Sequence, residues 1–302
     1  MSDQHAPAEQ ATLAPYLWRS PLLGELRELT LRQGPLQYFE RGEGPVLVFA
    51  HGWLANANLW RTVVDLLAER FRCISLDLPL GSHRVAMSES ADLTPDGCGG
   101  LIGDALEALD LADVTLIGND SGGAYSQIAL AARPARIARL VLNSCETPFD
   151  EFPPPPFDGL PQAARETEVL GNLFGALRDR EVRATPLAYG LLIKHPVDDV
   201  VSDSYALACL HNPDVLRDTS KVMSTAASAP VHRAGRRLIA EFSRPVLFAW
   251  SPEDRVFPVA HAERYAAQLA DGRVELIADA YSFTPEDQPR ALALVIERFA
   301  TR

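Results

Sequence analysis

A glycine-rich stretch with the sequence LIGNDSGGA places two reactive residues, Asp120 and Ser121, side by side. At the apex of a sharp strand-to-helix turn, a carboxylate or a hydroxyl can act as a nucleophile, and a carboxylate can also exchange protons. Such a turn needs small residues two positions before and two positions after its apex, because the chain is crowded there. Gly118 and Gly122 hold those positions around Asp120, whereas an asparagine lies two residues before Ser121. The spacing therefore predicts Asp120 as the reactive residue.

Three further stretches carry residues of catalytic type, and each directly follows a predicted strand. They are AHGW, which ends at Trp53, WSPED, which contains Asp254, and ADAYSF, which contains Ser282. Ligands of parallel α/β sheets bind outside the carboxyl ends of the strands. We therefore expect these loops to gather around Asp120.

Strand and helix patterns alternate along most of the chain. Short apolar runs predict strands, and the longest of them have no polar alternation, which is typical of strands covered on both faces. Segments with helical spacing separate them, which indicates right-handed crossovers and a doubly wound, mostly parallel sheet. The predicted strands are 26–31, 36–40, 45–50, 73–78, 113–118, 137–143, 244–250 and 273–278, and the predicted helices are 59–71, 101–111, 122–132, 258–269 and a last one ending near residue 299.

The alternation stops over residues 146–241, where helical patches are broken by prolines. This segment is predicted to be a helical cap inserted into the sheet domain. The expected organisation is a partly disordered arm over 1–23, a first core part over 24–145, the cap, and a second core part over 242–302. Aromatic residues of the cap are candidates for the wall of an apolar pocket. They are Phe149, Phe152, Phe157, Phe174, Tyr189 and Tyr205.

The composition excludes several classes of function. The net charge of the 302 residues is −12, with only two lysines, which argues against a nucleic-acid surface. No apolar run has the length of a membrane span, and the first residues lack the pattern of a secretory signal. Four cysteines lie far apart without a CxxC pair, which is typical of reduced thiols. We expect a cytoplasmic protein that binds no nucleic acid, membrane, metal or organic cofactor.

These motifs, in this order, resemble the α/β-hydrolase fold, in the branch of haloalkane dehalogenases and epoxide hydrolases that carries aspartate at the nucleophile elbow. The resemblance extends from about residue 26 to residue 299. It implies that the backbone N–H groups of Trp53 and Ser121 form an oxyanion hole. It also implies that Asp254 is the acid of a catalytic triad with Asp120 as the nucleophile.

The last loop departs from that family pattern. Relatives carry their catalytic histidine in a stretch resembling DAxHF…EDxP, and here the same frame reads DAYSFTPEDQP, with Ser282 in the histidine position. No histidine follows His261. In these relatives the histidine activates the water that hydrolyses an ester formed on the aspartate. Because a serine hydroxyl is far less basic than imidazole, an ester on Asp120 should persist.

Other residues could replace the missing base or supply an acid. His83 follows a central strand and is the best placed by topology. Glu146 follows the strand that ends at residue 143, the other position where dehalogenases carry their triad acid, so the resemblance makes it the alternative to Asp254. Tyr189 and Tyr205 of the cap could protonate a leaving oxygen, as the lid tyrosines of epoxide hydrolases do. Trp53 could donate its indole N–H to a halide or contact the cap as part of the pocket wall.

Three functions remain open from the sequence. The first is an enzyme that uses Asp120 as a general acid or base on a small molecule, in an isomerisation, elimination or cyclisation. The second is a dehalogenase-like or epoxide-hydrolase-like enzyme with a surrogate base, and the third is a ligand binder without activity. The missing histidine favours the first. The sequence leaves open whether the chain also forms a homodimer.

Overall fold

The computed structural model describes residues 14–301, which form a mixed sheet of eight strands in the order β1-β2-β4-β3-β5-β6-β7-β8. β1 and β2 pair antiparallel, β2 pairs antiparallel with β4, and every other pair is parallel. This confirms the predicted doubly wound, mostly parallel sheet. The strands are β1 Glu25–Leu31, β2 Gly34–Arg41, β3 Val46–Ala50, β4 Arg72–Leu76, β5 Val114–Asn119, β6 Ile137–Asn143, β7 Val246–Trp250 and β8 Gly272–Leu276.

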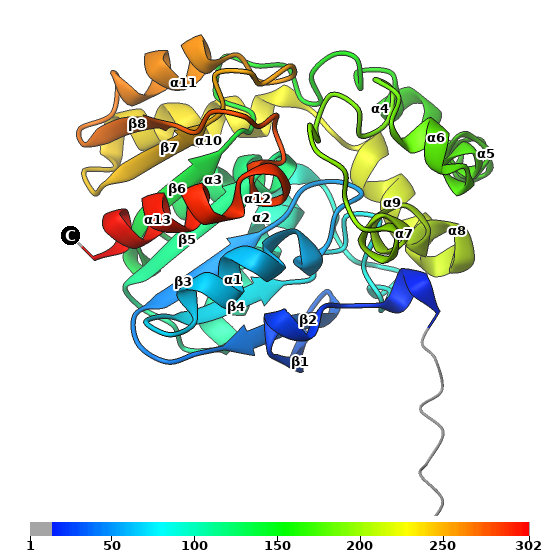
Figure 1. Cartoon of the computed structure of the whole chain (residues 1–302), viewed down its shortest axis with the longest axis horizontal. Helices are drawn as coiled ribbons and strands as arrows, with labels where there is room; N and C mark the ends of the chain where they lie inside the picture. The colour runs from blue at the N-terminus through cyan, green and yellow to red at the C-terminus, as the bar shows by residue number, and fades with distance from the viewer. Residues whose placement is uncertain (1–13, 302) are drawn as a thin grey trace, which may run out of the picture.

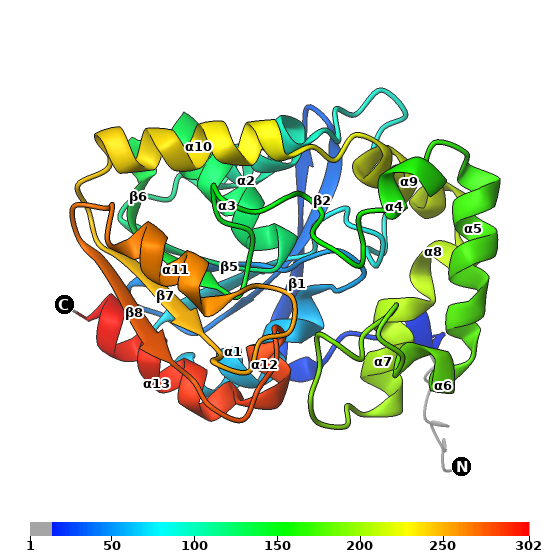
Figure 2. The same ribbon diagram turned by 90° about the horizontal axis from the view of Figure 1, so that it is seen from above.

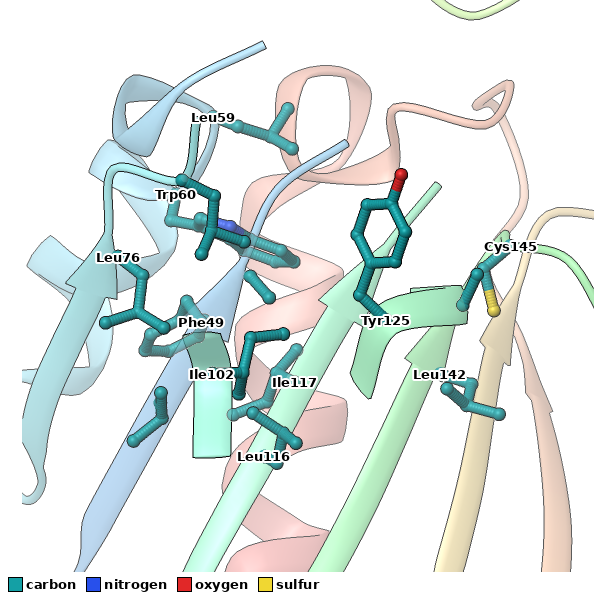
Figure 3. Close-up of a cluster of buried hydrophobic side chains, with 14 of the residues drawn as sticks. Phe49, Leu59, Trp60, Leu76, Ile102, Leu116, Ile117, Tyr125, Leu142 and Cys145 are labelled. Carbon is teal, nitrogen blue, oxygen red and sulfur yellow. The ribbon is translucent and has the colours of Figure 1, made fainter. Parts of the chain in front are cut away.

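Helices cover both faces of the sheet, which explains the apolar runs of its central strands. α1 (Arg61–Leu67) and α13 (Pro289–Ala300) pack together on one face, and α2 (Pro95–Ala108) packs with α3 (Ser121–Ala132) on the other (Figure 2). All six residues of β5 are buried. Figure 3 shows part of the resulting core, where side chains of β3, β5 and β6 meet those of the helices. Two shorter helices, α11 (Val259–Ala266) and α12 (Thr284–Asp287), complete the second core part.

A helical segment separates β6 from β7, and all of its helices except the last lie to one side of the sheet (Figure 1). Its helices are short because prolines and glycines interrupt them. They are α4 Leu160–Ala163, α5 Thr167–Gly175, α6 Arg180–Arg183, α7 Asp199–Ala206, α8 Ala208–His211, α9 Pro213–Ser224 and α10 Ser228–Glu241.

The last of these helices, α10, packs on the core helix α3, away from α4 to α9 (Figure 2). It buries Val231, Ala234 and Leu238 along one face, and a Cβ on Gly235 would lie 2.7 Å from Pro148. The predicted cap boundary at residue 241 therefore includes a helix of the core layer. We use the name cap for residues 146–226.

Of the predicted N-terminal arm, the structure describes the part from residue 14 onward; residues 1–13 lie outside the described range. Two 3-10 helices, η1 (Pro15–Leu17) and η2 (Pro21–Leu23), run along the core and the cap. Between them, Arg19 forms a buried ion pair with Asp77, with 2.9 Å between Nη2 and Oδ2. Within residues 14–301, no helix is long and apolar enough to cross a membrane.

Candidate active site

Asp120 stands at the turn between β5 and α3. Its backbone has φ 54° and ψ −142°, a conformation that non-glycine residues adopt at a cost and that is typically found at functional turns. The surrounding chain holds it there, because its N–H donates to the carbonyl of Ser144 at 2.9 Å and its carbonyl accepts from Gly123 at 2.8 Å. The geometry is that of a nucleophile elbow with Asp120 at the apex.

Glycines permit this turn because neighbouring backbone atoms approach them too closely for a Cβ to fit. A Cβ on Gly122 would lie 2.4 Å from the carbonyl oxygen of His51, and a Cβ on Gly118 would lie 2.6 Å from the carbonyl oxygen of Gly122. On the facing loop, a Cβ on Gly52 would lie 2.3 Å from Oδ1 of Asp120. Larger residues at these positions would displace either the elbow or its carboxyl group.

The two predicted oxyanion-hole residues lie beside the Asp120 carboxyl group. The N–H of Ser121 donates to Oδ1 of Asp120 at 2.5 Å, and the N–H of Trp53 donates to Oγ of Ser121 at 2.9 Å. Burial raises the pKa of Asp120 to about 6, although hydrogen bonds from Ser121 and Trp53 oppose that rise. Asp120 is therefore ionised for the most part at neutral pH and can still exchange its proton there.

Ser282 contacts Asp254, its expected partner. The Ser282 hydroxyl donates to Oδ1 of Asp254 at 2.8 Å, and the same oxygen accepts the N–H groups of Val256 and Phe257. The carbonyl of Ser282 accepts from the side-chain amide of Asn119, the residue before Asp120, at 2.8 Å. Burial raises the pKa of Asp254 despite these hydrogen bonds. The structure thus brings the Asp254 and Ser282 loops against the elbow.

His83 does not reach this site, which corrects its prediction as a surrogate base. Its ring is buried, and Nε2 lies 3.4 Å from Oδ2 of Asp218, a residue of α9. His51 is buried too, with Nε2 accepting from the N–H of Leu78 and Nδ1 placed 2.9 Å from the carbonyl of Gly52. Burial lowers the pKa of His51 to about 4, so its ring stays neutral and orders the loop.

Asp120 opens onto a cavity of about 270 Å³ between core and cap. Most of the wall is apolar, and the cap contributes Phe157, Phe174 and Leu177 to it. Of the remaining predicted wall residues, Tyr189 lines the cavity, while Phe149, Phe152 and Tyr205 do not. Within the part of the chain that the structure describes, no histidine, lysine or arginine lines this cavity. No trio of described histidine, cysteine or carboxylate side chains could hold a metal ion.

Of the other candidate acids, Glu146 and Tyr189 line the cavity and Tyr205 does not. Glu146 lines the cavity, and its Oε2 has no hydrogen-bond partner among the described residues. Tyr189 donates its hydroxyl to the carbonyl of Leu54 at 2.8 Å. Tyr205 lies outside the cavity, where it donates to Glu286 at 2.5 Å, which corrects its prediction as an acid. The two tyrosine rings pack against each other with 6.4 Å between their centroids, but only Tyr189 lines the cavity.

Trp53 lies in the cavity wall, and its indole N–H donates to the hydroxyl of Tyr125 at 2.9 Å. Tyr125 was not predicted from the sequence, because a helical tyrosine gives no sign of the side chain it will meet. Asn119, whose amide links the elbow to the Ser282 loop, was not predicted either. A polar residue at the end of a fully buried strand is a signal that could have identified Asn119.

The model of a protein family described as the α/β hydrolase fold matches residues 45–289. The chain belongs to the α/β hydrolase-fold family. Among the relatives of this α/β hydrolase-fold protein, haloalkane dehalogenase 2 of Mycobacterium tuberculosis is 24% identical over 301 residues, which cover 91% of this chain and 95% of that protein. An uncharacterized hydrolase of Bacillus subtilis, YugF, is 23% identical over 278 residues, which cover 87% of this chain and 93% of that protein.

Solved structures agree with this assignment of the fold. The crystal structure of the haloalkane dehalogenase DbeA from Bradyrhizobium elkani matches with a TM-score of 0.75 at 18% identity, and the match covers 92% of this chain and 97% of that one. These comparisons confirm the predicted fold and the resemblance to dehalogenases.

Proposed function

We propose that this α/β hydrolase-fold protein catalyses proton transfer on a small neutral molecule and that Asp120 is its general base. One observation supports this most strongly: Asp120, with a pKa of about 6, opens onto an apolar cavity whose described wall contains no histidine. A base whose pKa lies near the working pH is basic enough to accept a proton and is still present in its unprotonated form. Isomerisation, elimination and cyclisation each include such a proton abstraction.

The Ser121 and Trp53 N–H groups support the role of Asp120 as a base. Both lower the pKa of Asp120 against the effect of burial. They therefore favour the ionised form of the carboxyl group in a cavity whose burial favours the protonated form.

Hydrolysis is less well supported by the residues around Asp120. An ester on Asp120 would need a base to activate water, and the Ser282 hydroxyl already donates to Asp254. The dehalogenases among the relatives favour hydrolysis as a second candidate function. For a halide substrate the indole N–H of Trp53 would have to leave its hydrogen bond with Tyr125.

The test is exchange of carbon-bound protons with deuterium in D₂O, followed by NMR on neutral apolar C–H acids such as cyclohexanone and nitrocyclohexane. The wild-type protein should accelerate the exchange. Incubation with alkyl halides and epoxides should give no steady release of alcohol or diol, and intact-mass spectra would show any adduct on the protein. Steady release of alcohol or diol that depends on Asp120 and persists in Ser282→Ala would contradict the proposal and establish the hydrolase.

The exchange rate should increase with pH through about 6. Asp120 acts as a base only when ionised, and its raised pKa of about 6 places that transition above the ordinary range of aspartate. Below the transition, kcat/KM should fall about tenfold per pH unit, because the protonated group cannot accept a proton. A rate profile at constant ionic strength checks this. A rate that stays constant between pH 5 and 7 would exclude Asp120 as the base.

Replacing Ser282 by histidine should introduce ester hydrolysis. The new imidazole would occupy the position beside Asp254 and could activate water, an effect of about 10²–10⁴-fold for general-base catalysis. Any adduct that alkyl halides form on Asp120 should persist in the wild type and in Ser282→Ala, and it should disappear with time in Ser282→His. Because Ser282 is fully buried, a thermal melt must first show that the variant folds. A persistent adduct in the folded variant would contradict the assignment of this loop.

A further inference from the structure

Glu146 is the second carboxyl group of the cavity, and neither the fold nor the proposed role of Asp120 accounts for it. It follows β6, which pairs in parallel with β5, the strand that leads to Asp120. Both residues therefore extend from neighbouring strand ends at the same edge of the sheet. Each contributes to the wall of the same cavity.

The Glu146 carboxyl group lacks the partners that a buried carboxylate needs. The residue is 2% exposed, and its Oε2 has no hydrogen-bond partner among residues 14–301. The side-chain amide of Gln127 donates to the backbone carbonyl of Glu146 at 2.7 Å and so holds the backbone of the residue. An ionised carboxylate in such a position would be unfavourable, because only the hydrogen bond from its own backbone N–H compensates for its loss of water.

The surroundings of Glu146 favour its protonated form. Burial raises the pKa of Glu146 well above its ordinary range, and the negative charges of Asp120 and Asp150 raise it further. The hydrogen bond from its own backbone N–H acts in the opposite direction. Two carboxyl groups in one cavity whose environments separate their proton affinities form a pattern typical of an acid and a base in a shared site.

We propose that Glu146 is the proton donor of this cavity and acts together with the proton acceptor Asp120 on a neutral carbonyl compound. The inference rests on the proposed function of Asp120 and adds to it the class of substrate. Asp120 takes the proton from the carbon beside the carbonyl, and the electron pair of that C–H bond forms the C=C bond of an enol. The carbonyl π electrons move to oxygen, which takes the proton of Glu146. Return of the protons, at the same or at another carbon, restores both groups.

The cavity wall is suited to a neutral substrate. No arginine, lysine or histidine of the described residues lines it, so an anionic substrate would meet no opposite charge. The ionised carboxylate of Asp120 would also repel it. An apolar ketone or a related carbonyl compound needs only a proton acceptor near its carbon and a proton donor near its oxygen.

Infrared spectroscopy tests the protonation of Glu146 without a substrate. Near neutral pH the wild-type protein should show a C=O stretching band of a carboxylic acid. The band should be lost in Glu146→Gln and kept in Asp120→Asn and in the control Glu69→Gln, which changes an exposed carboxylate. Absence of the band in the wild type, or its persistence in Glu146→Gln, would overturn the proposal.

Deuterium exchange tests the donation itself. Cyclohexanone needs a proton on its oxygen when its C–H proton leaves, whereas nitrocyclohexane forms a nitronate that is stable without one. Glu146→Gln keeps the shape and neutrality of the protonated acid but has no proton to transfer. It should slow exchange on the ketone by about 10²-fold or more and change exchange on the nitroalkane by only a few-fold.

The outcomes separate this inference from the function on which it rests. Equal slowing of both compounds in Glu146→Gln would overturn the role of donor, because it would show an effect on Asp120 or on the cavity shape. No slowing of either compound would overturn it as well. If Asp120→Asn left both rates unchanged, or if the wild type exchanged neither compound, the proposed function itself would fail, and the donor role would fail with it.

Discussion

Replacing Asp120 with asparagine should lower the exchange rate on both the ketone and the nitroalkane by about 10²–10⁴-fold. Asparagine has the shape of aspartate, and its carbonyl oxygen can accept the hydrogen bond that Ser121 donates. The amide cannot take up a proton at neutral pH, so the geometry is kept and the base is lost. The decrease should appear in kcat and in kcat/KM, because the lost group acts in the transition state.

Melting temperatures distinguish the loss of the base in Asp120→Asn from a loss of the fold. Burial raises the pKa of Asp120, so the carboxyl group destabilises the fold as the pH rises from the ordinary pKa of aspartate to about 6. The full cost remains at neutral pH, and the neutral amide avoids it. Asp120→Asn should therefore melt at the same temperature as the wild type or higher. Asp158→Asn removes an exposed carboxylate of the cap and should keep the full rate. If the Asp120→Asn protein folds and keeps the wild-type rate, a group other than Asp120 must be the base.

Replacing Arg19 with alanine should lower the free energy of unfolding by about 3–5 kcal/mol. The side chains of Arg19 and Asp77 are 2% and 1% exposed, and the guanidinium also donates to the carbonyl of Ser82 at 2.7 Å. Loss of the arginine leaves Asp77 buried with the Ala57 N–H as a donor but without its opposite charge. Urea denaturation measures the loss.

The loss of unfolding free energy caused by Arg19→Ala should depend on pH. Burial raises the pKa of Asp77, but the charge of Arg19 outweighs it and the net pKa lies below the ordinary value. The ion pair thus stabilises the fold above the ordinary pKa of aspartate, and this contribution is lost as the pH falls through the lower folded value. Arg237→Ala, which breaks an exposed pair with Glu241, should change stability by less than about 1 kcal/mol. Equal effects of the two variants would contradict a structural role of the N-terminal segment.

The elbow was predictable because crowding at the turn restricts two positions of short, fixed spacing. A Cβ on Gly118 would meet the carbonyl of Gly122 within the turn, and a Cβ on Gly122 would meet the carbonyl of His51 on the facing loop. The sheet was predictable for a similar reason, since strands covered on both faces must be apolar throughout. The position of Ser282 could be assigned because the residues on either side of it match the family pattern.

The candidate bases and acids could not be sorted from the sequence. His83 and Tyr205 lie in plausible positions along the chain, but each turns toward a carboxyl group outside the cavity, Asp218 and Glu286 respectively. A loop position shows which edge of the sheet a residue reaches and does not show its side-chain rotamer or partner. The ion pair of the N-terminal segment could not be predicted either, because Asp77, which binds Arg19, is 58 residues away.

The sequence by itself determined the fold, the apex of the elbow and the absence of a histidine from the last loop, because each depends on residue types at short, fixed spacings. Only the tertiary structure decided which ionisable groups share the cavity with Asp120 and which of them lack a partner. That choice depends on burial and on contacts between distant segments, and these set whether a carboxyl group such as Glu146 is paired, solvated or protonated.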